Sequence, residues 1–203
     1  MNAMPSSSMQ GKSAPDKKPE RSVRVIRGQH HKFMLLPVTP ENAKWFEAGP
    51  VTFAVEARVI GVGDAVVERG ASLHVFGADR AQEYLRFDCF EGQPHYHYIH
   101  NDLQHNSVWG YDDVANGPMR EWAVRTVRAH LPEMLRRAGA DELAAHVEAS
   151  GFETSVLDGI SQELQAAHER TFPGADMLEE ARELYVRWKS LHPEFNTVEE
   201  GEY

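Results

Sequence analysis

Histidine is the residue type that most distinguishes this chain. Its 203 residues include 11 histidines, and an imidazole side chain titrates near neutral pH and binds transition metals. Histidine therefore directs the search for acid–base or metal chemistry. Seven of the histidines lie between residues 30 and 105: His30, His31, His74, His95, His97, His100 and His105.

The densest group lies in the segment 83–102, EYLRFDCFEGQPHYHYIHND. Gly92 and Pro94 separate two runs in which side-chain polarity alternates, so the segment predicts a β-hairpin. The register of this hairpin decides which side chains meet, because a slip of one residue turns every side chain to the other face. A loop of three residues would place Cys89 opposite His95.

We favour a register with an even number of loop residues. It places Asp88 opposite His97 and Phe90 opposite His95. It also brings together on one face five side chains that can join a core: Leu85, Phe87, Cys89, Tyr96 and Tyr98.

The polar sides of four neighbouring strands can then combine into one sheet face. Consecutive strands are neighbours in most sheets, and alternate residues of a strand point to the same side. Arginines on this face can bind a small anionic ligand through paired hydrogen bonds. The side chains expected on this face are Glu56, Arg58, His74, Arg86, Asp88, His95 and His97.

Two imidazoles and a carboxylate on this face can hold one divalent metal ion. Such a ligand set leaves coordination positions open for water or substrate, as in hydrolytic zinc sites and iron-dependent oxygenases. Zinc, iron and manganese suit these ligands. The candidate metal ligands are His74, His95, His97, Asp88 and Glu56.

Two other interpretations of the same face need no metal. A carboxylate behind an imidazole raises its basicity, and an arginine beside the pair binds an anion, so His97, Asp88 and Arg86 are candidate catalytic residues for acid–base chemistry. Alternatively, the face is a solvated, charge-paired surface, which antiparallel sheets often present to water.

The segment PHYHYIHND resembles the metal-binding motif of the cupin family, in which a His-x-His pair is followed by an acidic residue. The resemblance implies metal ligation by His95, His97 and Asp102. Cys89 stands where that motif has a glycine, and the sequence that follows predicts helices where the second cupin motif requires strands. We therefore do not assign the chain to the cupins.

Apolar and polar residues alternate through the first half of the chain with the period of a β-strand. The connections between these segments are too short for helical crossovers, so an antiparallel meander is expected. The expected strands are 22–27, 32–38, 51–60, 72–76, 84–90 and 95–100, and 107–118 is expected to be a loop.

After residue 117 the apolar spacing becomes that of a helix. Pro118 suits a first helical turn, Pro132 must kink or divide the first helix, and Gly139 ends it. Further helices are expected at 141–149, 155–170 and 176–192. The fold class is therefore α+β: an antiparallel sheet of about four to six strands over residues 22–100, followed by three or four α-helices packed on one face.

Composition divides the chain into a body and two tails. Residues 1–20 are rich in serine, proline and lysine without an apolar period, which indicates a disordered basic tail. Residues 21–195 are expected to form a single α+β domain, and residues 196–203 an acidic, frayed tail.

Charge and composition exclude several classes of protein. The formal charge of −10 makes nucleic acid an unfavourable partner. A single cysteine forms no internal disulfide and no cysteine-rich zinc module. No apolar stretch has the length of a membrane helix, and the N-terminus lacks the apolar region of a secretory signal, so we expect a soluble, cytoplasmic protein with no membrane partner.

No complete catalytic motif accompanies these features, and a basic tail on an acidic body favours docking. The first expectation is therefore a soluble, bacterial-type accessory or interaction protein. It would work as a subunit of a larger enzyme or assembly, or as a homo-oligomer, with the polar sheet face as its binding surface. The alternatives are a small metal-dependent hydrolase or oxygenase that uses His74, His95 and His97 with Asp88 or Glu56, and a metal-free, nuclease-like acid–base enzyme.

Overall fold

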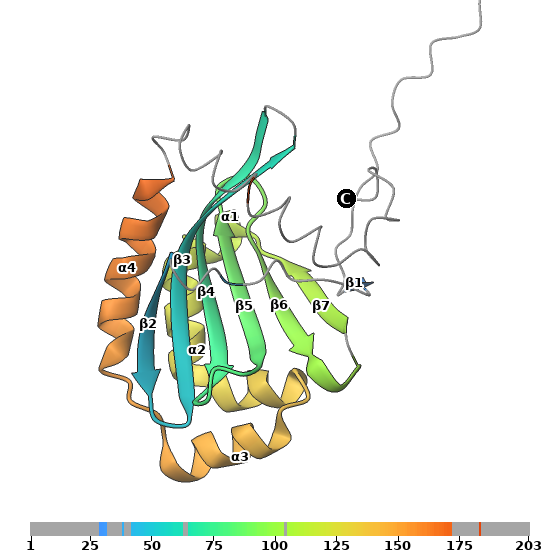
Figure 1. Ribbon diagram of the computed structural model, residues 1–203, viewed down its shortest axis with the longest axis vertical. Coiled ribbons are helices and arrows are strands. Elements are labelled where there is room, and N and C mark those ends of the chain that lie inside the picture. Colours follow the sequence, from blue (N-terminus) through green and yellow to red (C-terminus); the bar gives the residue numbers. More distant parts are fainter. Residues whose placement is uncertain are drawn as a thin grey trace, which may run out of the picture.

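A single antiparallel sheet of seven strands is the centre of the fold (Figure 1). The computed structural model describes residues 29–31, 38, 42–62, 65–103, 105–171 and 183. The strand order is β1-β7-β6-β5-β4-β3-β2, so strands β2 to β7 follow one another as a meander. The strands are β1 (Gln29–His31), β2 (Ala43–Ala48), β3 (Val51–Val62), β4 (Ala65–Gly77), β5 (Glu83–Phe90), β6 (His95–His100) and β7 (His105–Gly110).

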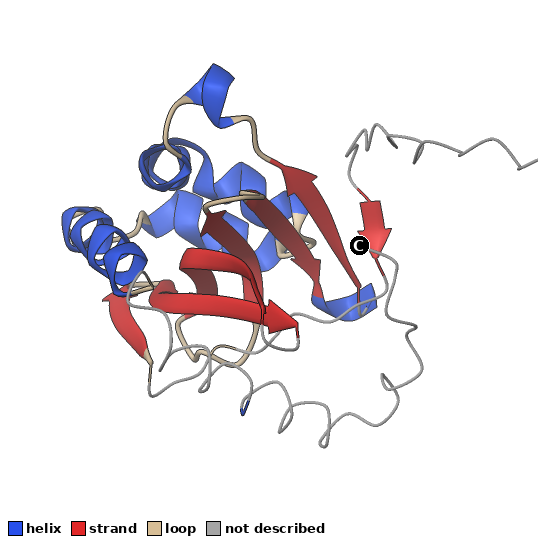
Figure 2. Cartoon of the chain, turned by 90° about the horizontal axis from the view of Figure 1, so that it is seen from above, coloured by secondary structure: helices blue, strands red, loops and turns tan. Residues whose placement is uncertain are grey.

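Four α-helices follow the sheet in the described residues, and the two longest pack on one of its faces (Figures 1 and 2). The four helices are α1 (Asp113–Asn116), α2 (Met119–Arg137), α3 (Asp141–Ser150) and α4 (Val156–Arg170), and a short 3-10 helix, η1 (Asn101–Leu103), joins β6 to β7. None of the described helices is both long and apolar enough to cross a membrane. The α+β class is confirmed.

The expected end of the sheet at residue 100 is wrong. The sheet continues beyond it, because residues 105–110 form β7 where a loop was expected from residue 107. The expectations for residues 1–20, 22–27, 32–38, 176–192 and 196–203 lie outside the described residues, apart from residues 38 and 183.

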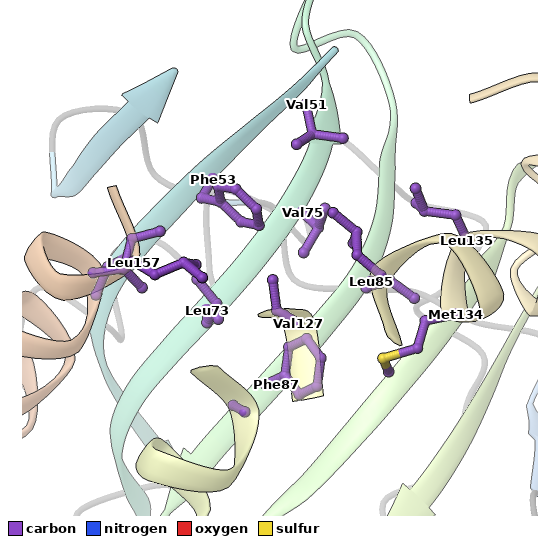
Figure 3. Packing of buried hydrophobic residues seen from close by; sticks show 14 of the residues in the cluster. Val51, Phe53, Leu73, Val75, Leu85, Phe87, Val127, Met134, Leu135 and Leu157 are labelled. Carbon is purple, nitrogen blue, oxygen red and sulfur yellow. The ribbon is translucent and has the colours of Figure 1, made fainter. Parts of the chain in front are cut away.

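The core forms where the apolar faces of the strands meet the apolar stripes of α2 and α4 (Figure 3). Alternate residues of β3, β4 and β5 point to the helices and are fully buried, among them Phe53, Leu73 and Phe87. The helices supply the facing side chains, such as Val127 of α2 and Leu157 of α4. Burying one such side chain contributes about 1.5 to 3 kcal/mol, so this face fixes which way the strands point.

Pro132 has the predicted effect on α2. The backbone of His130 leaves the helical region, with φ of −135° and ψ of 16°, and the helix continues beyond it. Proline has no N–H to donate, and its ring collides with the carbonyl group four residues earlier, so the distortion falls just before Pro132.

The β5–β6 hairpin has the predicted faces but not the predicted partners. Asp88 lies opposite His95 and Arg86 opposite His97, two residues away from the expected register. A shift of two residues leaves every side chain on the same face, so Leu85, Phe87 and Cys89 still join Tyr96 and Tyr98 on the core side. The shift arises because the last two residues of β5 pair only with β4, opposite Ala71 and Gly70.

Candidate metal centre

The polar side chains of the sheet lie on the face away from the helices, and they are buried. The exposed fraction is 0% for His74, 2% for Arg86 and 3% for Asp88. The expectation of one shared polar face is confirmed, whereas the alternative of a solvated face is wrong. Cross-strand pairing arranges the face in two rows, Glu56–Ser72–Asp88–His95 and Ala54–His74–Arg86–His97.

Asp88 is the centre of the first row. Its Oδ1 accepts a hydrogen bond from the Ser72 hydroxyl and lies 3.4 Å from Nη1 of Arg58. Its Oδ2 lies 3.1 Å from Nε2 of His97 and 3.4 Å from Nε2 of His95. Burial raises the pKa of Asp88, but the hydrogen bonds with the two histidines and the charge of Arg58 outweigh it and hold the pKa well below its ordinary value. Asp88 is therefore a carboxylate.

The two histidines are oriented by hydrogen bonds at their other ring nitrogen. Nδ1 of His95 lies 2.7 Å from the backbone carbonyl oxygen of Gln93, and Nδ1 of His97 lies 3.0 Å from Oδ1 of Asn106. Carbonyl oxygens only accept hydrogen bonds, so each Nδ1 carries a proton. In the neutral ring, Nε2 then presents its lone pair to the Asp88 carboxylate.

Three acceptor atoms thus converge on one point, which requires a cation between them. Nε2 of His95, Nε2 of His97 and a carboxylate oxygen of Asp88 lie within 4.8 Å of one another. A proton on one imidazole satisfies the requirement, and so does a metal ion. Burial lowers the pKa of His95, but the hydrogen bond and charge of Asp88 outweigh it and raise the net pKa, whereas burial keeps the pKa of His97 below its ordinary value. Of the two imidazoles, His95 therefore has the higher pKa and accepts a proton more readily than His97.

This donor set fits a divalent transition metal with open coordination positions. Two imidazoles and one carboxylate occupy three positions, and imidazole with carboxylate suits zinc, iron and manganese. The His95 side chain is 24% exposed, against 5% for Asp88 and 11% for His97, so solvent reaches the group from the side of His95. The hydrogen bonds from Ser72 to Asp88 and from His97 to Asn106 are of the kind that orient ligands around a metal ion in metal sites.

Two of the five predicted ligands lie outside this group. Nδ1 of His74 is 2.7 Å from Oε1 of Glu83, and Oε1 of Glu56 is 3.2 Å from Nε of Arg58. His74 and Glu56 are therefore engaged by other charged partners. Among the described residues Nε2 of His74 is buried and has no hydrogen-bond partner.

The guanidinium of Arg86 is also engaged elsewhere. Its Nε and Nη2 donate to the two carboxylate oxygens of Glu83, at 2.8 and 2.6 Å. Burial raises the pKa of Glu83, but Arg86 and His74 outweigh it and lower the pKa to about 2. Of the proposed acid–base set, His97 and Asp88 are in contact, whereas Arg86 is held by Glu83.

Sequence reasoning missed Glu83, Ser72 and Asn106. Alternation along β5 assigns Glu83 to the core face, but a register shift between Val75 and Phe76 pairs Glu83 with Phe76 and turns it to the polar face. Asn106 lies in β7, where no strand was expected. Alternation placed Ser72 on the polar face, two residues before His74, but it gave no sign of the hydrogen bond from Ser72 to Asp88.

Cys89 takes the structural role that was expected of it. Its thiol is buried in the core, and burial raises its pKa, so it is not a thiolate nucleophile.

Residues 45–164 match the model of one protein family, described as Domain of unknown function (DUF7700). The chain belongs to this family. The DUF7700 match runs from β2 into α4 and contains Asp88, His95 and His97, together with Ser72 and Asn106. No curated protein and no solved structure matches the chain.

The cupin-like motif does not define the ligand set. Asp102, the acidic residue of that motif, lies exposed in η1 and is not part of the group that Asp88 forms with His95 and His97. The strands of this DUF7700 chain form one sheet, and helices follow the last strand.

Proposed function

We propose that the buried polar face binds one divalent transition metal through Asp88, His95 and His97, and that the chain is a small metal-dependent enzyme of the hydrolase or oxygenase type. One observation carries the proposal: two imidazole Nε2 atoms and a carboxylate oxygen lie within 4.8 Å of one another. The Nδ1 atom of each imidazole donates a hydrogen bond to a carbonyl oxygen, which leaves Nε2 free to face the other ligands. Metal-ligating histidines have this arrangement.

The number of ligands favours catalysis over a purely structural role. Structural zinc sites are closed by four protein ligands, whereas catalytic sites keep a position for water or substrate. Here the group has three ligands, and one of them, His95, is partly exposed. A metal ion with an open position would lower the pKa of bound water or polarise a carbonyl group, which is the chemistry of hydrolases. Two histidines and one carboxylate with open positions are also the ligand set of non-haem iron oxygenases.

Metal content is the direct test. We expect protein purified without an affinity tag to carry about one zinc, iron or manganese ion per chain, or to bind one on titration, by elemental analysis and calorimetry. The double variant His95→Ala/His97→Ala should lose this binding. The matched control is His146→Ala, which removes an exposed histidine from α3. Absence of stoichiometric metal, or equal loss in the control, would overturn the proposal.

An accessory role in a larger assembly is the competing proposal. Burial of the polar face does not favour docking through its side chains. The accessory role is better supported by a group of half-buried aromatic residues on the core side, because aromatic side chains are enriched at interaction hot spots. These residues are Tyr96, Trp109 and Tyr111. Light scattering after size-exclusion chromatography tests the homo-oligomeric form. If the protein is a monomer at every concentration, the homo-oligomeric form is excluded. A dimer that dissociates on the substitution Trp109→Ala would support it.

A further inference from the structure

The helices cover their side of the sheet unevenly. α4 packs on β2, β3 and β4, and α2 packs on β5 and β6, so β7 lies at the margin of the helical layer (Figure 1). Aromatic side chains occupy this margin. Tyr96 and Tyr98 alternate along β6, and Trp109 of β7 lies opposite Tyr96. Tyr96 and Trp109 are only half-buried, so part of each side chain faces solvent.

These rings continue from the strands onto α2. The Tyr96 ring lies 5.2 Å from the ring of Trp122 in α2, and the Trp122 ring lies 4.9 Å from the ring of Tyr111. Trp122 and Tyr111 are also half-buried. We call Tyr96, Trp109, Tyr111 and Trp122 the aromatic row. Such side chains offer a partner a large contact area at a small cost in conformational entropy.

Arg137, the last residue of α2, is held against this margin by two rings. Its Cζ atom lies 4.4 Å from the centroid of the Trp109 ring and 4.8 Å from that of the Tyr98 ring. The side chain of Arg137 is nevertheless exposed. The two ring contacts restrict the guanidinium, and its donors that point away from the rings remain available to an acceptor. Part of the entropy that binding would cost is therefore already lost in the folded chain.

Arg137 has no carboxylate partner among the described residues. Nε1 of Trp109 is buried and also has no hydrogen-bond partner in the described part of the chain. Arg137 and Trp109 together thus offer donors for a carboxylate oxygen. Three other arginines of α2 are already paired: Arg125 with Glu121, Arg128 with Asp158 and Arg136 with Glu148.

We propose that Arg137 binds a carboxylate of an extended acidic peptide in a partner protein, and that apolar side chains of this peptide lie on the aromatic row. A guanidinium binds a carboxylate through paired hydrogen bonds. The rings of Tyr96, Trp122 and Tyr111 extend the surface by up to about 10 Å, which matches about three residues of an extended chain. A small carboxylate would leave this surface unused.

The proposal does not depend on the metal centre, because the aromatic row and the proposed metal ligands lie on opposite faces of the sheet. Long-range electrostatics do not favour the peptide either. The formal charge of −10 opposes an acidic ligand, so any binding reports local contacts at Arg137 and the row.

The test uses the full chain and a fluorescein-labelled peptide in which glutamate and phenylalanine alternate. A second peptide has glutamine in place of each glutamate and carries the same label. Fluorescence anisotropy measures the binding of both. We expect the glutamate peptide to bind with saturation and about tenfold more tightly than the glutamine peptide.

Two variants at neighbouring positions separate a specific contact from general charge. Arg137→Gln should weaken binding of the glutamate peptide about tenfold. Arg136→Gln removes the same charge one residue away, from an arginine already paired with Glu148, and should change binding by less than about twofold. Arg137→Lys keeps the charge without the planar fork, so it should weaken binding several-fold.

Nuclear magnetic resonance locates the peptide on the folded protein. The chain has four tryptophans, and the indole N–H signal that disappears in Trp109→Phe belongs to Trp109. This signal should shift on addition of the glutamate peptide. The signal of Trp45, which lies in β2 at the other end of the strand order, should not shift.

The outcomes are distinct from those of the metal test. Absence of saturable binding, equal binding of the two peptides, or equal losses in Arg136→Gln and Arg137→Gln would overturn the proposal. Sodium glutarate that binds as tightly as the glutamate peptide would overturn the peptide as the occupant. His95→Ala/His97→Ala should leave peptide binding unchanged, so failure of the metal site and failure of this site are separate results.

Discussion

The hydrogen bond between Asn106 and His97 provides a sharp test of the metal centre. Oδ1 of Asn106 lies 3.0 Å from Nδ1 of His97, and the Asn106 side chain is 3% exposed. Asn106→Ala removes the acceptor that holds the imidazole in its metal-ligating tautomer. Loss of such an outer contact typically lowers metal affinity about 10- to 100-fold, which is about 1.4 to 2.7 kcal/mol.

The reverse change is expected from Asn106→Asp. A carboxylate accepts the Nδ1 proton more strongly and makes the imidazole a better ligand, and it adds a negative charge near the metal. We therefore expect zinc affinity to rise several-fold in this variant. The two substitutions at one position thus predict shifts of opposite sign.

Competition with a chromophoric chelator measures the zinc affinity of each variant. Thermal unfolding of the metal-free proteins establishes that the variants are folded, because removing a buried hydrogen-bond partner itself costs about 1 to 3 kcal/mol. Asn101→Ala is the control, since the side chain of this asparagine donates a hydrogen bond to the backbone carbonyl of Glu83, which is not one of the three proposed ligands. Unchanged affinity in Asn106→Ala, or equal losses in both Asn106 variants, would refute the role of this contact.

Three further predictions concern the elements that support the site. Phe87 is fully buried and makes an edge-to-face contact with Trp122 of α2, so Phe87→Ala should lower the free energy of unfolding by about 3 to 5 kcal/mol in urea denaturation, and a loss below about 1 kcal/mol would contradict the packing. The pKa of Glu83 is about 2 against an ordinary 4.5, so its carboxylate adds about 3 kcal/mol of stability above pH 4.5, which is lost as the pH falls towards 2. Glu83→Gln should remove this part of the pH dependence in urea series between about pH 2 and 6, and an unchanged profile would count against the ion pair. A methyl group on Gly70 would lie 2.5 Å from the carbonyl oxygen of Cys89, so Gly70→Ala should cost about 1 to 3 kcal/mol, and more than Gly92→Ala, where the nearest atom belongs to a flexible side chain.

The faces of the sheet could be predicted from the sequence because they depend only on a period of two. Leu73 and Phe87 were assigned to the core by alternation, and Asp88 and His97 to the opposite side. The same rule holds for any register that differs by two residues. For this reason the faces were correct while the partner of Asp88 was not.

The contacts around the ligands could not be predicted in the same way. Glu83 reaches the polar face only through an irregularity in the pairing of β4 with β5, and alternation carries no sign of it. Asn106 belongs to a strand whose short run, HNSVWG, has weak alternation. Burial of Arg86 could not be predicted either, because polar residues on one side of a strand usually indicate a face that is exposed to solvent.

The three proposed ligands belong to one hairpin, and this has a consequence for folding. Asp88 and His97 are nine residues apart, so the ligand set assembles as soon as β5 pairs with β6, within microseconds for an ordinary hairpin. Ser72 and Asn106 belong to the flanking strands, and they lock the ligands only when the sheet extends to both sides. The hairpin alone would therefore bind a metal ion weakly, and the complete sheet would bind it more tightly. Binding to the hairpin would stabilise its correct register before the core is complete.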